Sequence, residues 1–192
     1  MSDRGRHRPV VIAEHTPNPD CVKLVVPSLE EPGAGVDVPR GDAERISSLA
    51  ARLYRLDGLE RVLVGPGFVA LTRRRGAPWD RLAPAATEIL RRQVERGERW
   101  LVKPPRAPRP AEAPEGADSE RVRELLERQI RPAVQAHGGD VALVEVRGGV
   151  VEVSLRGACA GCPSALRTLR AGIESSLRAA IPEVERVVCR DL

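Results

Sequence analysis

The stretch VALVEVRGGVVEVSLRGACAGCPS, residues 141–164, decides the fold of the second half of this chain. Apolar residues alternate with other residues at a period of two around Gly148-Gly149, which is the pattern of half-buried strands. A Gly-Gly pair between two such strands is typical of a two-residue hairpin turn, because glycine readily adopts positive φ. The stretch therefore predicts strands at 141–147 and 150–156, followed directly by a loop that contains two cysteines.

Apolar residues at helical spacing lie on both sides of this hairpin. Residues 118–137 predict a helix with a kink at Pro132, whose nitrogen carries no proton for the backbone bond to residue 128. Residues 163–180 predict a second helix, and residues 185–190 predict a last strand. The resulting order, α-β-β-α-β, is that of a two-layer sandwich with helices on one face of a sheet.

The first hundred residues predict another small sandwich. The patterns indicate four strands, at 10–14, 21–26, 61–64 and 68–72, and two helices, at 41–57 and 79–96. Between 15 and 21, the segment TPNPD predicts a turn, because each Pro fixes its own φ while Asn and Asp satisfy nearby backbone groups.

A change of composition separates the two parts of the chain. The segment KPPRAPRPAEAPEGAD, residues 103–118, is rich in Pro, Ala and charge and lacks a periodic apolar pattern. Such a segment buries little surface and tends to remain an extended linker. We therefore expect an α+β protein with two small two-layer α/β sandwich domains, at 8–102 and 118–192, joined by a flexible Pro/Ala-rich linker at 103–117.

Charge and composition limit the classes of function. The 192 residues carry a net charge of +4, with 42% hydrophobic and 30% charged residues, which fits a globular protein. The basic excess is small and aromatics make up only 2%, so nucleic-acid binding is not expected. The sequence has no run of about 18 apolar residues, so no membrane contact through a spanning helix is expected. The first residues lack the apolar segment of a secretory signal, and we expect a cytoplasmic protein with reduced thiols.

Two of the four cysteines, Cys159 and Cys162, lie in the loop GACAGCPS. Pro163 suits the first turn of a helix because it lacks an N–H, so Cys162 is expected at the N-cap and Cys159 just before it. The backbone N–H groups and the positive end of the helix favour the thiolate, the form that binds metal or attacks disulfides. The small residues between the cysteines leave room for a bulky inorganic group.

Three kinds of chemistry fit this pair. The first is an iron–sulfur site, which uses thiolates at this spacing and often has Pro directly after a ligand Cys. The second is a zinc site with four thiolates, and the third is a dithiol–disulfide oxidoreductase. In the thioredoxin pattern the helix begins near the first Cys, whereas here it is predicted after the second, which weakens the redox interpretation.

Either metal site needs about four ligands. Cys21 begins a predicted strand, and Cys189 lies in the apolar strand VVC, where a Cys is usually a small buried hydrophobe. His7, His15 and His137 show no ligand spacing. One chain therefore offers two good ligands, and the simplest completion is a second copy of the same chain.

Residues 130–187, from IRPAVQAHGGD to IPEVERV, strongly resemble the C-terminal NifU-like (Nfu) domain. The resemblance rests on the RP…GGD segment, the Gly-x-Cys-x-x-Cys-Pro loop and the IPEV after the second helix. HTPNPDCVKLVVP (15–27) and ISSLAARLYRLDGLERVLVGPGFVALTR (46–73) resemble the N-terminal domain found in Nfu proteins. The departures are mild: His137 stands where Asp is frequent, and 164–166 has fewer hydroxyl residues than many members.

This resemblance implies a scaffold or carrier that assembles a [4Fe–4S] cluster and hands it to apo-proteins. Family members hold the cluster between two subunits with two Cys from each, which makes Cys159 and Cys162 the expected cluster ligands. The implied partners are a second copy when the cluster is bound, apo iron–sulfur client proteins, and an upstream cluster scaffold or cysteine desulfurase system. The resemblance leaves open whether [2Fe–2S] is also held.

No other catalytic motif accompanies the cysteine pair. The sequence contains no GxSxG, GxxxxGK[ST] or HExxH, and no GxGxxG after a strand. We therefore expect a protein that is not an enzyme. The alternative of a different class is a dithiol–disulfide oxidoreductase using the same two cysteines, and a structural zinc dimer is third.

Overall fold

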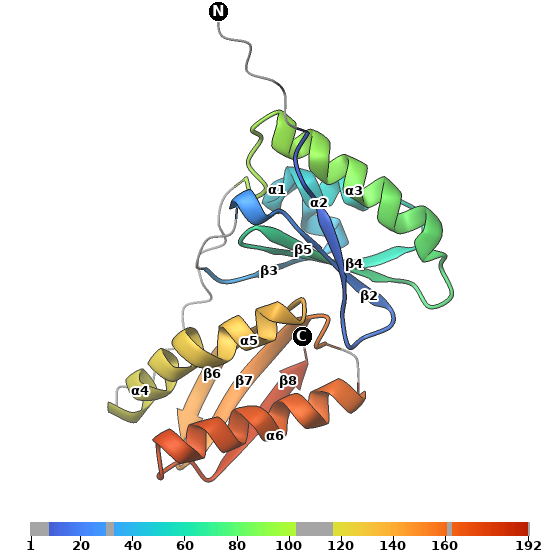
Figure 1. Ribbon diagram of the computed structural model, residues 1–192. Coiled ribbons are helices and arrows are strands. Elements are labelled where there is room, and N and C mark those ends of the chain that lie inside the picture. Colours follow the sequence, from blue (N-terminus) through green and yellow to red (C-terminus); the bar gives the residue numbers. More distant parts are fainter. Residues whose placement is uncertain (1–7, 30–32, 103–116, 161–162, 192) are drawn as a thin grey trace, which may run out of the picture.

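The computed structural model describes residues 8–29, 33–102, 117–160 and 163–191. The chain is an α+β protein with two sheets, each with helices on one face and a hydrophobic core between the layers (Figure 1). This confirms the predicted fold class. The predicted linker at 103–117 lies almost entirely outside the described residues, so the domain boundaries stay a prediction.

The N-terminal domain is a five-stranded sheet with the order β1-β2-β5-β4-β3, in which all neighbouring strands are antiparallel. Its elements are β1 (Ile12–His15), β2 (Cys21–Val25), η1 (Pro27–Leu29), β3 (Val36–Val38), η2 (Arg40–Asp42), α1 (Ala43–Ile46), α2 (Ser48–Leu53), β4 (Leu59–Gly65), β5 (Phe68–Arg73) and α3 (Trp79–Glu95). Strand β3 was not predicted, because three residues are too few to show a period of two.

The prediction of a single helix at 41–57 is wrong. The segment is divided into two helices at Ser47, which has an extended backbone (φ −149°, ψ 113°). The Ser47 hydroxyl accepts the N–H of Ala50 at 3.0 Å and so caps the second helix, α2. Ser is favoured at such caps and competes with helix in mid-segment, which is the physical reason for the break.

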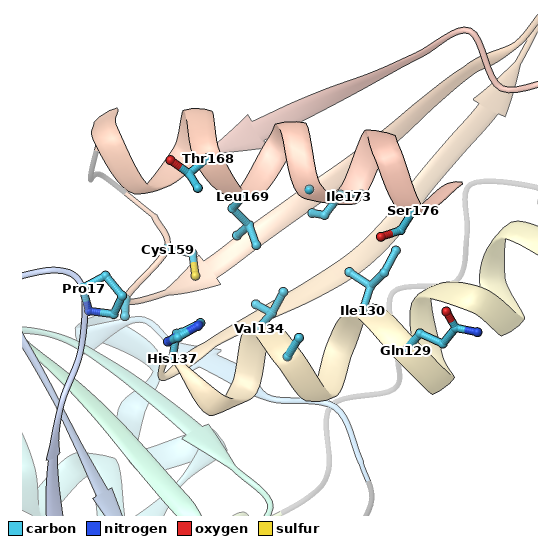
Figure 2. Close-up of a pocket in the computed structure, with 13 residues that line it drawn as sticks. Pro17, Gln129, Ile130, Val134, His137, Cys159, Thr168, Leu169, Ile173 and Ser176 are labelled. Atoms are coloured by element: carbon cyan, nitrogen blue, oxygen red, sulfur yellow. The ribbon is translucent and has the colours of Figure 1, made fainter. Parts of the chain in front are cut away.

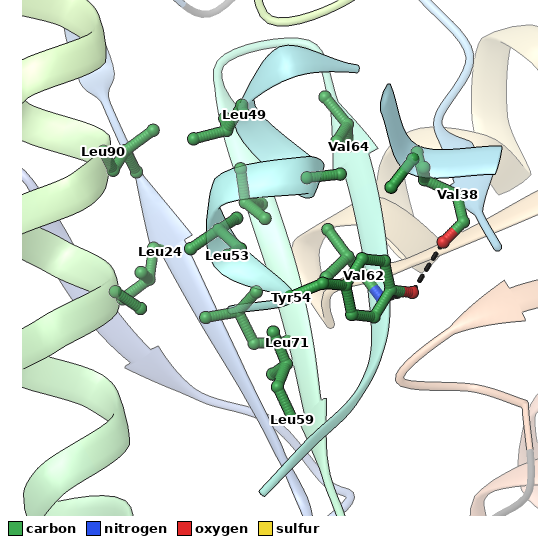
Figure 3. Close-up of a cluster of buried hydrophobic side chains, with 14 of the residues drawn as sticks. Leu24, Val38, Leu49, Leu53, Tyr54, Leu59, Val62, Val64, Leu71 and Leu90 are labelled. Atoms are coloured by element: carbon green, nitrogen blue, oxygen red, sulfur yellow. Dashed lines mark hydrogen bonds between the residues drawn. The ribbon is translucent and has the colours of Figure 1, made fainter. Parts of the chain in front are cut away.

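The core of the N-terminal domain lies between the sheet and the helices α2 and α3. Leu24 and Leu71 from the sheet pack against Leu53 and Leu90 from the helices (Figure 3). The buried Tyr54 hydroxyl donates to the carbonyl oxygen of Val38 at 2.6 Å and accepts the N–H of Val62 at 3.1 Å. The hydroxyl therefore ties the short edge strand β3 to β4 by way of the end of α2.

The opposite face of this sheet is also buried. All five residues of β2 are buried, and the period of two directs Val22 and Leu24 to the helical layer. A second apolar cluster lies on the other face of the sheet and includes one residue of the C-terminal domain, Ala158. Its members are Cys21, Val25, Leu63, Phe68, Ala70 and Ala158. A strand covered on both faces reads as a continuous apolar run, as CVKLVV nearly does.

The C-terminal domain has the predicted order α-β-β-α-β. Its elements are α4 (Ala117–Leu125), a π-helical turn (Leu126–Ile130), α5 (Arg131–Ala136), β6 (Gly139–Arg147), β7 (Val150–Gly157), α6 (Pro163–Ala180) and β8 (Arg186–Asp191). β6 and β7 form the predicted hairpin, whose turn residues Gly148 and Gly149 both have positive φ. β8 runs parallel to β7, so α6 is the crossover between two parallel strands.

The kink predicted at Pro132 takes the form of a π-turn. The N–H of Arg131 bonds to the carbonyl of Leu126, five residues back instead of four. Because Pro132 has no N–H to donate, the wider turn directly before it replaces a regular α-helical turn that could not be completed. Val134 on α5 remains buried despite the extra residue.

Candidate metal centre

Cys159 lies between the end of β7 and the start of α6, as the sequence predicted. Strand β7 ends at Gly157, which has φ of +65°, and α6 begins at Pro163. Cys159 is only 6% exposed. Cys162 lies outside the described residues, so the structure places one member of the predicted ligand pair, and the assignment of both as ligands stays a prediction.

The sulfur of Cys159 rests against the start of β6. A Cβ added to Gly139 would lie 2.4 Å from Cys159 Sγ and 3.1 Å from both Val134 Cγ1 and the carbonyl oxygen of Arg156. Real Cβ atoms do not approach another heavy atom to 2.4 Å. The second Gly of the HGGD segment is therefore required because the cysteine sulfur occupies the space of its side chain.

The other residues of the HGGD segment also act at this place. Gly138 ends α5 with φ of +76°, and its carbonyl accepts the N–H of Ala158 at 3.1 Å. Asp140 is fully buried and pairs with Arg131 Nε at 3.2 Å. Its carboxylate also accepts the Gln135 side-chain amide at 3.1 Å. Burial raises the pKa of the Asp140 carboxyl, while Arg131 and the hydrogen bonds counteract this rise.

A cavity of about 670 Å³ opens beside Cys159, between α5 and α6 (Figure 2). The sulfur lies at one end of the cavity, with Leu169 of α6 and Val134 of α5 on its two sides. Much of the lining is apolar, including Ile130 and Ile173. The cysteine loop is therefore accessible from this side through space between the two helices.

The N-terminal domain covers the other side of the loop. The side-chain amide of Asn18 donates to the carbonyl oxygen of Ala158 at 3.2 Å, and Pro17 lines the same cavity as Cys159. Both belong to the TPNPD turn, which the sequence indicated only as a local turn. No periodicity of the sequence could reveal this contact, because it joins residues 140 positions apart.

The remaining two cysteines lie in strands, as the sequence predicted. Cys21 is 4% exposed at the start of β2, and Cys189 is half-buried in β8 against the C-terminal core. Within the described ranges, no three or more His, Cys, Asp or Glu side chains lie close enough together to hold a metal ion. A site that needs about four ligands therefore has to obtain the others from residues beyond these ranges or from another molecule.

Cys21 is expected to react slowly with thiol reagents. Burial raises the pKa of the Cys21 thiol from 9.0 to about 11, with hydrogen bonds and Arg61 acting in the opposite direction. At pH 8 the thiolate fraction then falls about a hundredfold, since each pKa unit is a factor of ten. Peptide-level mass spectrometry after brief iodoacetamide treatment measures this, with guanidinium-unfolded protein as the control. Equal rates in the folded and unfolded chain would contradict the buried position.

Two family models match the chain, one in each domain. The model of the NifU-like domain matches residues 122–188, and that of the scaffold protein Nfu/NifU N terminal matches residues 11–97. The first range contains Cys159, Cys162 and the HGGD segment, and the second contains the TPNPD turn.

Curated relatives match both domains together. The NFU1 iron–sulfur cluster scaffold homolog, mitochondrial, of Drosophila persimilis is 32% identical over 199 aligned residues, covering 97% of this chain and 67% of that protein. The chain belongs to the Nfu family of iron–sulfur cluster scaffold proteins. The Nfu relative of the same name from Drosophila virilis is 30% identical, and the alignment covers 97% of this chain and 63% of the length of that relative. The chain thus spans about two thirds of the length of its Nfu relatives.

The comparison with solved structures adds a weak likeness. The solution structure of a NifU-like protein from Saccharomyces cerevisiae matches 54% of this Nfu chain and 93% of its own, with 20% identity and a TM-score of 0.47. None of the helices among the described residues is both long and apolar enough to cross a membrane.

Proposed function

We propose that this Nfu chain binds a [4Fe–4S] cluster between two copies, through Cys159 and Cys162 of each, and transfers it to apo-proteins. The observation that supports this most is the position of Cys159, at a strand end just before the N-terminus of an 18-residue helix. Its sulfur packs against Gly139, which has no side chain to displace it. The cluster is the cargo of such a protein and leaves with the acceptor.

The chemistry of the loop suits this cargo. Iron–sulfur clusters are held by cysteine thiolates, usually four of them, and two cysteines per chain therefore require a second chain. The positive end of α6 lies next to the loop and favours the negative charge of thiolates and of the cluster. A cluster shared between two chains is released when they separate, which fits delivery to an acceptor.

The two alternatives find less support. A dithiol–disulfide oxidoreductase of the thioredoxin type has its helix begin near the first cysteine, whereas α6 begins at Pro163, after both. A structural zinc dimer would use the same ligands, and it finds less support because the relatives are named as iron–sulfur cluster scaffold proteins. Scaffold function also agrees with the absence of a second catalytic motif in the sequence, and we propose that the protein is not an enzyme.

Anaerobic reconstitution with ferrous iron and sulfide tests the proposal. We expect a broad charge-transfer absorption band, about four irons per two chains, and a mass of two chains by native mass spectrometry. Mixing the loaded protein with an apo-dehydratase that needs [4Fe–4S] should then restore the activity of that enzyme. Zinc as the sole bound metal, or a colourless single chain that reduces insulin, would contradict the proposal.

The remaining proposals concern the setting of the protein. The chain either receives a finished cluster from an upstream scaffold or assembles it with sulfur from a cysteine desulfurase system, the two kinds of upstream partner that its family suggests. The named relatives carry the word mitochondrial. The cytoplasmic location expected from this sequence therefore stays a prediction, which fluorescence of a tagged chain in its own cell can test.

A further inference from the structure

The second face of the N-terminal sheet packs directly on the cysteine loop. Ala158, next to Cys159, is 2% exposed and belongs to the same apolar cluster as Leu63 and Phe68 of the N-terminal sheet. A Cβ added to Gly157 would lie 2.7 Å from Leu63 Cδ2, so the backbone of the loop touches this face. The apolar face of the N-terminal sheet therefore packs against Gly157 and Ala158 of the same chain.

Hydrogen bonds fix the two domains in this arrangement. Asn18 holds the loop itself through the carbonyl of Ala158. The side-chain amide of Gln135 donates to the carbonyl oxygen of Gly33 at 2.8 Å. The N–H of Gly35 donates to the buried Asp140 at 3.1 Å. The contact therefore combines an apolar patch with specific polar bonds, as protein interfaces generally do.

This arrangement places the N-terminal domain directly next to the predicted cluster ligand. Ala158 packs on the N-terminal sheet, while Cys159 packs in the core of its own domain, with Pro17 of the N-terminal domain lining the cavity beside it (Figure 2). A cluster shared by two copies needs both cysteine loops to face each other across a few ångströms, with iron bonded to each sulfur. The N-terminal domain occupies the space next to the loop on the side of Ala158.

We propose that the N-terminal domain is a removable cap on the cysteine loop, so that interdomain contact and cluster sharing exclude each other. In the capped chain the backbone at Gly157 and Ala158 is held against the N-terminal sheet, and separation of the domains frees this backbone next to Cys159 and exposes the apolar sheet face. The predicted linker gives the domains room to separate without unfolding. The inference rests on the proposed function for its second half only, because the cap itself can be measured without iron.

Two isosteric variants, one in each domain, loosen the cap. Asn18→Asp retains the oxygen that accepts the N–H of Asp20 at 3.0 Å but places a carboxylate against the carbonyl of Ala158. Gln135→Glu removes the donor to Gly33 and puts a second carboxylate beside Asp140. Asp57→Asn, an acid–amide exchange at a 99% exposed side chain, is the control.

The first experiment uses the full apo chain without iron. Iodoacetamide labelling of Cys159 is followed by mass spectrometry, with fragment spectra that separate it from Cys162. Each variant replaces an amide that donates a hydrogen bond across the domains with a carboxylate, which favours the open form. We therefore expect Cys159 to be labelled about tenfold faster in each variant than in wild type. The radius of gyration from X-ray scattering should increase in the same variants. Labelling and scattering that match wild type and Asp57→Asn in both variants would overturn the cap.

The second experiment compares apo and iron-loaded wild-type protein. Carboxylate-reactive dihydrazide cross-linkers, chosen because residues 118–192 contain no lysine, should join the two domains within one chain in the apo protein, and these cross-links should disappear in the loaded dimer. Intact interdomain cross-links in a loaded dimer would overturn the exclusion. Failure to bind iron would count against the proposed function, while the labelling rates would still decide whether the cap exists.

Discussion

Cys159→Ser is expected to reduce the bound iron from about four per two chains to nearly none after anaerobic reconstitution. The serine oxygen is a hard ligand that rarely deprotonates, whereas iron in these clusters prefers soft thiolate sulfur. Because two copies share one cluster, the substitution removes two of the four ligands at once. Cys162→Ser should have the same effect for the same reason. Iron and sulfide content and the visible absorption measure the loss.

Cys189→Ser is the control for this prediction. Cys189 is half-buried in β8 and packs against the core of the same domain, so the exchange affects packing and not ligation. We expect it to bind iron as wild type does. The variant Cys21→Ser gives a second control in the N-terminal domain. Loss of iron in either control, or retention of iron in Cys159→Ser, would contradict the assignment of the ligands.

Gly139→Ala is expected to damage both the stability of the C-terminal domain and the binding of iron. The new Cβ would lie 2.4 Å from Cys159 Sγ, and the carbonyl of Arg156 at 3.1 Å limits its escape. Overfilling a packed site costs about 1–3 kcal/mol of the free energy of unfolding. The sulfur is the atom that has to move, so the iron content should fall together with the midpoint of urea unfolding.

Gly172→Ala is the matched control on α6. A Cβ added to Gly172 meets nothing within 4 Å. Ala is favoured over Gly inside a helix by about 0.5–1 kcal/mol, so this variant should be slightly more stable than wild type and should bind iron normally. If Gly139→Ala has the stability and the iron content of the wild type, then the position of the Cys159 sulfur does not require a glycine at residue 139.

Local patterns of the sequence were sufficient for most of the secondary structure. The hairpin around Gly148-Gly149 and the helix from Pro163 follow from turn chemistry and from the rules for helix starts, which act over a few residues. The break at Ser47 and the strand Val36–Val38 were not found. In the first, a cap overrides the apolar period, and in the second the strand is too short to have one.

The candidate site was predictable only in part for a similar reason. The CxxC spacing and the following Pro indicate metal chemistry directly, because adjacent ligands on one loop leave a local signature. The requirement for Gly139 has no such signature. It arises because β6 and the loop after β7 approach each other in space, and only the folded chain shows that the sulfur takes the place of a side chain.

The sequence by itself determined the α+β class, the two domains of the Nfu family and the cysteine pair, since these depend on short-range patterns and on a recognisable loop. The tertiary structure alone decided what surrounds that pair. Asn18 and Ala158 are 140 positions apart, and Gly35 and Asp140 are 105 apart. Contacts of this separation depend on how two sheets pack, which no local periodicity encodes, and they place the N-terminal domain over the cysteine loop.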